Sequence, residues 1–115
     1  MLGIIIINKT ISKEYLQEIA KQRFGDMVKG VIDISTKELA LGGELHADQE
    51  ALLIEKGNEQ DNLWGINIYV EEPFPENIEF DSIINIRPSQ NNRSRNVDDP
   101  EIQKIILAIL QELLE

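Results

Sequence analysis

The sequence predicts an α+β fold, in which a mainly antiparallel four-stranded sheet has helices packed on one face. Apolar residues alternate with a period of two in the middle of the chain, and they recur at helical spacing near both ends. The elements follow the order β-α-β-β-α-β-β-α, and antiparallel strands in this order need a cover on one face. The chain has 115 residues, of which 42% are apolar, so residues 1–115 are expected to form a single globular domain.

The first half of the chain predicts a strand, a helix and a hairpin. The apolar run from Ile4 to Ile7 is interpreted as a buried strand, because a membrane span needs about twenty apolar residues. Ser12 is a candidate N-cap for a helix that extends to about Phe24. Two alternating segments then predict the strands of a hairpin, at residues 27–34 and 38–45.

The segment Asp48 to Lys56 is open to two interpretations, because its apolar residues run continuously instead of periodically. We interpret it as a short helix that Asp48 caps and Gly57 ends, and a strand is the alternative. Two further strands are expected at residues 64–70 and 78–86.

The clearest helical pattern lies at the end of the chain. The apolar residues between Ile102 and Leu114 form one stripe at helical spacing. Asp98 and Glu101 stand at the spacing of a capping box, and Pro100 is compatible with a first helical turn. We therefore predict a final amphipathic helix.

Composition restricts the classes of protein to which this chain can belong. A formal net charge of -10 argues against nonspecific binding to nucleic acid or to an anionic membrane, since both need many basic contacts. The absence of cysteine excludes a disulfide scaffold and a thiolate zinc site. The first strand has no basic flank of the kind that a signal peptide carries. We expect a cytoplasmic protein without membrane association, and no motif indicates a cofactor or a catalysed reaction.

Three of the four arginines, Arg87, Arg93 and Arg95, lie in one polar segment. Residues 82–97 contain no Asp or Glu, so this segment is positive within an acidic chain. Guanidinium groups bind carboxylates and phosphates through paired hydrogen bonds, which indicates an anion-binding loop. The alternative is an internal role, in which the arginines tie the loop to acidic residues, namely Glu44, Asp48 or Asp81.

The single histidine, His46, stands two residues from a carboxylate on either side, Glu44 and Asp48. If the strand extended this far, all three side chains would share one face. They are therefore candidates for a catalytic group with His46 as general base. The structural alternative is that Glu44 and His46 end the strand and Asp48 caps the next helix. One histidine with scattered carboxylates does not indicate a metal site.

Alternation along the last two predicted strands separates polar from apolar side chains. Trp64, Ile66 and Ile68 are expected on one face of the sheet, with Asn67 on the other. Asn85 is expected on the same face as Asn67, so the two amides could line a site or simply face solvent.

Several sequence runs resemble those of a small prokaryotic family classed as a domain of unknown function. The runs are GELHAD (residues 43–48), LWGINIY (63–69), INIRPSQ (84–90) and NRSR (92–95). The resemblance covers the chain from about Phe24 to Ile102. It implies a small bacterial or archaeal cytoplasmic protein, and it assigns no catalytic residue or substrate.

Three functions are compatible with these patterns. The first is a binding module whose polar pocket takes a small anionic ligand or an acidic group of a partner protein, lined by Glu44, His46, Asn67, Asn85, Arg87, Arg93 and Arg95. The second is an enzyme that uses His46 as general base on an anionic substrate. The third is RNA contact through Arg93-Ser94-Arg95, against which the net charge argues.

Overall fold

The computed structural model describes residues 3–115, which form one five-stranded sheet and three α-helices. The helices are α1 (Lys13–Lys21), α2 (His46–Lys56) and α3 (Pro100–Leu113). The strands are β1 (Ile5–Ile7), β2 (Met27–Asp33), β3 (Leu39–Leu41), β4 (Leu63–Tyr69) and β5 (Ile78–Glu79). The spatial order is β1-β3-β2-β4-β5, and every neighbouring pair is antiparallel.

The α+β class and the antiparallel sheet are thus confirmed, with five strands in place of the expected four. The strand expected at Ile4 to Ile7 is present as β1, and it joins the sheet by pairing with β3, for example Ile6 with Ala40. At the centre, β2 and β4 pair along seven residues, from Met27 opposite Tyr69 to Asp33 opposite Leu63. The register of this central pair fixes which side chains of β2 and β4 lie next to one another on each face of the sheet.

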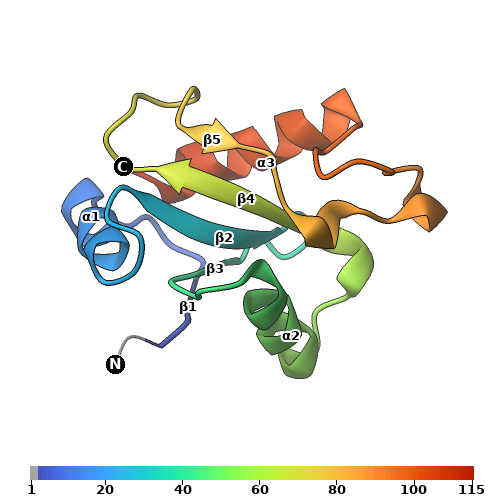
Figure 1. Ribbon diagram of the computed structural model, residues 1–115, viewed down its shortest axis with the longest axis horizontal. Coiled ribbons are helices and arrows are strands. Elements are labelled where there is room, and N and C mark those ends of the chain that lie inside the picture. The colour runs from blue at the N-terminus through green and yellow to red at the C-terminus, as the bar shows by residue number, and fades with distance from the viewer. Residues whose placement is uncertain (1–2) are drawn as a thin grey trace.

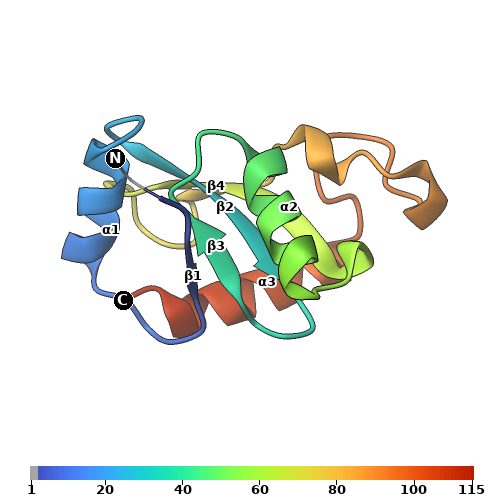
Figure 2. The same ribbon diagram turned by 90° about the horizontal axis from the view of Figure 1, so that it is seen from below.

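Helices cover both faces of the sheet, which differs from the expected cover on one face. The larger core includes Leu16 of α1, Ile106 of α3 and Trp64 of β4. A second, smaller core joins Leu53 of α2 to three sheet residues on the opposite face, Val31, Ala40 and Leu63. In Figure 1, α3 runs behind the sheet while α2 lies below β2 and β3, and Figure 2 shows α2 nearest the viewer. The central strands carry apolar residues on both faces, so each face needs a helix.

Local signals set the helix ends, with some shifts from the expected positions. The hydroxyl of Ser12 accepts a hydrogen bond from the backbone of Tyr15, as its role of N-cap predicts, and α1 ends at Lys21, before Phe24. Gly57 ends α2 with a φ of 117°, in the left-handed region where glycine is favoured. The cap of α3 is Asp99 instead of Asp98.

The start of α2 also differs from the expected one. The strand predicted over 38–45 is limited to Leu39–Leu41, and α2 begins at His46. Residue Leu45 occupies the cap position, where it supplies no side-chain hydrogen bond. Asp48 therefore lies inside the first turn, and the assignment of the segment to a helix is confirmed.

The strand predicted over 78–86 is wrong beyond Glu79, because the chain leaves the sheet there. The hydroxyl of Ser82 accepts a hydrogen bond from the backbone of Ile84 and starts a short 3-10 helix at Ile83–Asn85. This helix crosses β4 at Gly65, where a Cβ atom would lie 2.6 Å from both Cβ and Oγ of Ser82. Only glycine permits this approach, because a side chain at residue 65 would overlap Ser82.

We expect the substitution Gly65→Ala to lower the free energy of unfolding by about 1–3 kcal/mol, because the added methyl group overlaps Ser82. Urea unfolding of the variant and the wild type measures the difference. Gly3→Ala is the matched control, since nothing lies within 4 Å of its added Cβ. Equal stability of the two variants would contradict the close contact.

Candidate functional site

A pocket of about 280 Å³ lies where α2 begins, between the sheet and the segment that follows β5. Four apolar and four polar or charged residues line it: Leu45, Ala47, Ile83, Ile84, Lys29, His46, Ser82 and Arg95. Two of the apolar side chains are unusually exposed, Leu45 at 56% and Ile83 at 69%. The pocket therefore combines an apolar rim with two cations and one histidine.

A buried glutamine holds the start of α2 against the sheet. The side chain of Gln49 accepts a hydrogen bond from the backbone of Gly43 (2.8 Å) and donates one to the carbonyl of Ala40 (3.1 Å). It thereby links the first turn of α2 to β3. Because Leu45 provides no side-chain cap, this helix start lacks the usual internal acceptor, and helix N-termini of this kind favour anions.

The buried ring of His46 lies under this helix start. Its Nε2 is 2.8 Å from the carbonyl oxygen of Ile66 in β4. A carbonyl can only accept, so Nε2 carries a proton, and Nδ1 of the neutral ring is an acceptor. Burial lowers the pKa of His46 from its ordinary value, against the opposing effect of the bond to Ile66, and the charges of Lys29 and Arg95 lower it further. The ring is therefore neutral at pH 7.

The two cations come from opposite walls of the pocket. Lys29 projects from β2, and its Nζ lies 5.6 Å from the centroid of the Phe24 ring. Arg95 belongs to the loop before α3, and its Nε lies 2.6 Å from Oδ1 of Asp81. Both members of this ion pair are about half exposed, so the guanidinium also remains accessible to a ligand. The internal tie to Asp81, one of the alternatives from the sequence, is thus present.

A buried amide without a complete set of partners lies next to Lys29. Asn67 faces Lys29 across the β2–β4 pair and is 6% exposed. Its Nδ2 donates to the carboxylate of Glu79 and to the carbonyl of Asp81, whereas its Oδ1 is buried and has no partner among the described residues. A buried acceptor without a donor is costly. Asn67 is thus linked to the pocket through its strand neighbour Lys29, and it is not itself part of the lining.

Two of the predicted ligand-binding residues serve the fold instead. Asn85 is fully buried, and its amide binds both the backbone N–H (2.8 Å) and the carbonyl (3.0 Å) of Gly65. Arg87 lies over the Trp64 ring, 4.4 Å from its centroid, and donates to the carbonyls of Gln60, Leu63 and Ile84. These side chains hold the segment after β5 onto the sheet.

The remaining candidates are exposed and lie outside the lining of the pocket. Arg93 is exposed, and its guanidinium forms no ion pair among the residues that the structure describes. Glu44 and Asp48 are also exposed, and neither is a hydrogen-bond partner of His46. The expected alignment of these two carboxylates with His46 is wrong because the chain forms a helix from His46 onward, not a strand.

Internal hydrogen bonds order the loop that carries Arg87, Arg93 and Arg95. The side chain of Asn92 is buried, donates to the carbonyls of Asn85 and Asn96, and accepts from the backbone of Asp98. The loop is thus ordered by its own asparagines, as side-chain capping of loop backbone predicts. This order brings Arg95 to the pocket.

Sequence reasoning identified His46 and Arg95 but missed the rest of the lining. Lys29 could have been found from the sequence, because it is the one charged residue before Asp33 in the strand predicted over 27–34. In the structure it stands in register with Asn67. The apolar members Leu45 and Ile83 carry no comparable signal, since exposure of an isolated apolar residue is common.

The fold and the pocket define a class: a small α+β protein with an amphipathic cavity that Lys29 and Arg95 line. Within residues 3–115, no group of three or more potential ligands is arranged to hold a metal ion, and no helix is long and apolar enough to cross a membrane. The chain belongs to the family described as "Protein of unknown function (DUF5674)", whose model matches residues 5–113. No match was found among the curated proteins or the solved structures.

The lowered pKa of His46 predicts a specific dependence of stability on pH. The folded state disfavours the protonated ring, so protonation of His46 favours the unfolded state. The contribution of the neutral ring to the free energy of unfolding is therefore fully present above the ordinary pKa near 6.5. It declines as the pH falls through that value toward the lower pKa of the folded state. Urea unfolding between pH 8 and pH 5 should show a larger loss of stability in the wild type than in His46→Gln, which does not titrate.

A second measurement is the titration of the His46 ring by NMR. The chain has one histidine, so its NMR resonances need no further assignment. A midpoint at or above the ordinary value would contradict the buried, neutral ring.

Proposed function

We propose that this protein is a small-ligand binding module whose pocket takes a small amphipathic anion. The carrying observation is that Lys29, Arg95 and the uncapped start of α2 meet in one cavity, which apolar side chains also line. A carboxylate or phosphate group would bind at the cations, where charge-assisted hydrogen bonds are strongest. An apolar body would lie against Leu45 and Ile83, whose exposed surface it would remove from water.

The volume of the pocket limits the size of the ligand. A cavity of about 280 Å³ corresponds to roughly nine water molecules at liquid density. This is close to the lower end of small-molecule sites, which span about 300–1,000 Å³. A short-chain or aromatic carboxylate fits within this volume.

The neutral ring of His46 favours a ligand that carries a protonated or hydroxyl group close to its anionic group. Its Nε2 hydrogen is committed to Ile66, so the ring offers only an acceptor at Nδ1. A ligand with a hydroxyl group close to its carboxylate would satisfy this acceptor. Protonation of the ring at low pH would remove the acceptor and add a positive charge, which changes the preference toward the bare anion.

The same ring supports a second function, in which the protein is an enzyme with His46 as general base. The observation in favour is the free acceptor on a buried ring with a lowered pKa, beside two cations that would hold an anionic substrate. Glu44 and Asp48 do not orient the ring, so the Ile66 carbonyl would fill that role. A rate that falls with pH as His46 protonates, and that is lost in His46→Gln, would distinguish this function from simple binding.

RNA contact has less support in this arrangement. Arg87 and Arg95 are engaged within the chain, and Arg93 alone of the three extends without an ion pair from the described surface. A single arginine contributes little to phosphate binding on a chain of net charge -10.

The binding proposal predicts that hexanoate, benzoate and hexyl phosphate raise the melting temperature, in the order of their affinities at equal concentration, because they bind the native state. Hexanol, the neutral analogue, should bind more weakly. Lys29→Gln and Arg95→Gln should each weaken the anions about tenfold or more, the effect of losing one charge-assisted hydrogen bond. Thermal shift and isothermal titration calorimetry measure these changes.

Arg93→Gln is the matched control, since it removes the same charge from the same loop but outside the pocket. It should leave the affinity for each anion unchanged. The proposal fails if no anion of the panel binds the wild type, or if Arg93→Gln weakens binding as much as Arg95→Gln does.

A further inference from the structure

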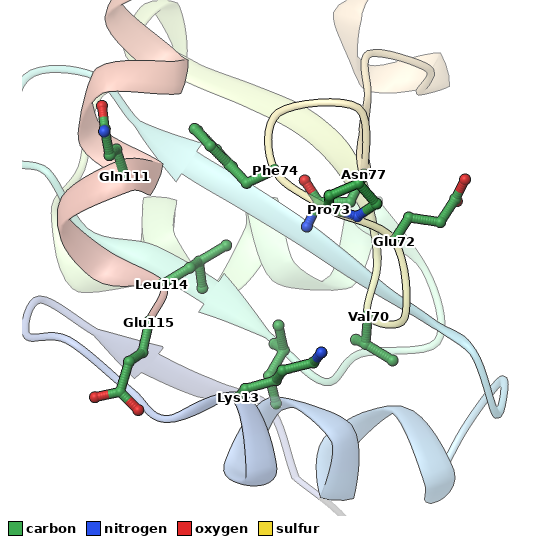
Figure 3. A pocket seen from close by; sticks show the side chains of 10 residues that line it. Lys13, Val70, Glu72, Pro73, Phe74, Asn77, Gln111, Leu114 and Glu115 are labelled. Atoms are coloured by element: carbon green, nitrogen blue, oxygen red, sulfur yellow. The ribbon is translucent and has the colours of Figure 1, made fainter.

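A second pocket, of about 230 Å³, lies at the end of the molecule where α1, the end of α3 and the β4–β5 connection meet (Figure 3). Its walls are mainly apolar and come from all three segments: Leu16, Val70, Pro73, Phe74 and Leu114. It shares no lining residue with the pocket at His46. The two sites can therefore be tested separately.

One buried side chain in this pocket lacks a partner. Asn77 is 8% exposed, and its Oδ1 is buried without a hydrogen-bond partner among the described residues. Its backbone is held on both sides, because its N–H donates to the carbonyl of Pro73 (3.0 Å) and its carbonyl accepts from Tyr69 (2.8 Å). The amide is thus fixed at the wall of the pocket by the turn, and an acceptor left unsatisfied there is costly.

The charges around the pocket favour a positively charged ligand that can donate hydrogen bonds. Lys13 lines it, but so do two carboxylates, those of Glu72 and Glu115, which lie at its outer edges in Figure 3. The connection Glu71 to Asn77 contains three acidic residues and no basic one. A cation entering this region gains attraction from several carboxylates, whereas an anion would rely on Lys13 alone.

We propose that this pocket binds a small organic ammonium ion, with an N–H group on Oδ1 of Asn77 and an apolar body between Val70, Phe74 and Leu114. The exposed ring of Phe74, 38% accessible, offers its face to the cation or to an aromatic body. The acceptor of Asn77 supplies the direction of binding, and the surrounding carboxylates supply the selection for positive charge.

Three probes that share a 2-phenylethyl group and differ in charge test the proposal: 2-phenylethylammonium, 2-phenylethanol and 3-phenylpropionate. Titration of ¹⁵N,¹³C-labelled protein should shift the Asn77 side-chain amide and the Val70 and Leu114 methyl groups with the ammonium ion. The alcohol should bind more weakly, and the carboxylate should bind weakest.

Three variants test the roles of individual groups. Asn77→Asp should strengthen ammonium binding roughly fivefold or more, because a charged acceptor replaces a neutral one. Asn77→Leu should abolish selection between the ammonium ion and the alcohol, and the backbone bonds of residue 77 do not depend on the side chain. Lys13→Gln should strengthen ammonium binding by removing the nearest like charge.

Asn96→Asp is the matched control for the change in charge. It precedes α3, whereas the pocket lies at the other end of this 14-residue helix, which is about 21 Å long. It should leave ammonium binding unchanged. The proposal is overturned if Asn96→Asp and Asn77→Asp have equal effects, if the carboxylate probe binds more tightly than the ammonium probe, or if no probe shifts the resonances of the pocket.

Discussion

The pairing of the Asn85 amide with the backbone of Gly65 is the contact on which the candidate site depends. One side chain binds both the N–H and the carbonyl of the same strand residue, and a third bond joins it to the carbonyl of Arg95. The segment after β5 is thereby fastened across β4 without forming a strand. Ser82, Ile83 and Arg95 reach the pocket because of this contact, since all three lie within the segment that it holds.

The two cores of the protein differ in size and in the polar groups beside them. The face covered by α1 and α3 contains most of the large apolar side chains and stabilises the sheet. The face covered by α2 has a core of only four buried residues, which leaves room beside α2 for polar groups. His46, Asn67 and Gln49 are buried on this side, and the pocket that includes His46 lies here.

Most of the fold could be predicted from periodicity, and the exceptions have local causes. The final helix follows its apolar pattern because it buries one clear stripe of side chains. The central strands were also predicted, although they bury apolar residues on both faces. The strand expected up to Ile86 fails because Ser82 binds its own backbone and Gly65 admits a crossing segment. Alternation of Ile84 and Ile86 with polar residues resembles a strand, and period alone cannot distinguish it from a short 3-10 helix packed on a sheet.

The sequence by itself determined the class of fold and the positive loop, and it indicated His46 and Arg95 as candidates, because charge and periodicity are properties of the chain. Only the tertiary structure decided which arginines are free to bind. Asn85 forms hydrogen bonds with the backbone of Gly65 in β4, and Arg87 donates to the carbonyl of Gln60 just before β4. Both partners lie twenty or more residues away in the chain. Lys29 and Asn67 become neighbours only through the register of β2 and β4. Such pairings depend on long-range contacts, and no local pattern specifies which distant carbonyl or carboxylate a side chain will meet.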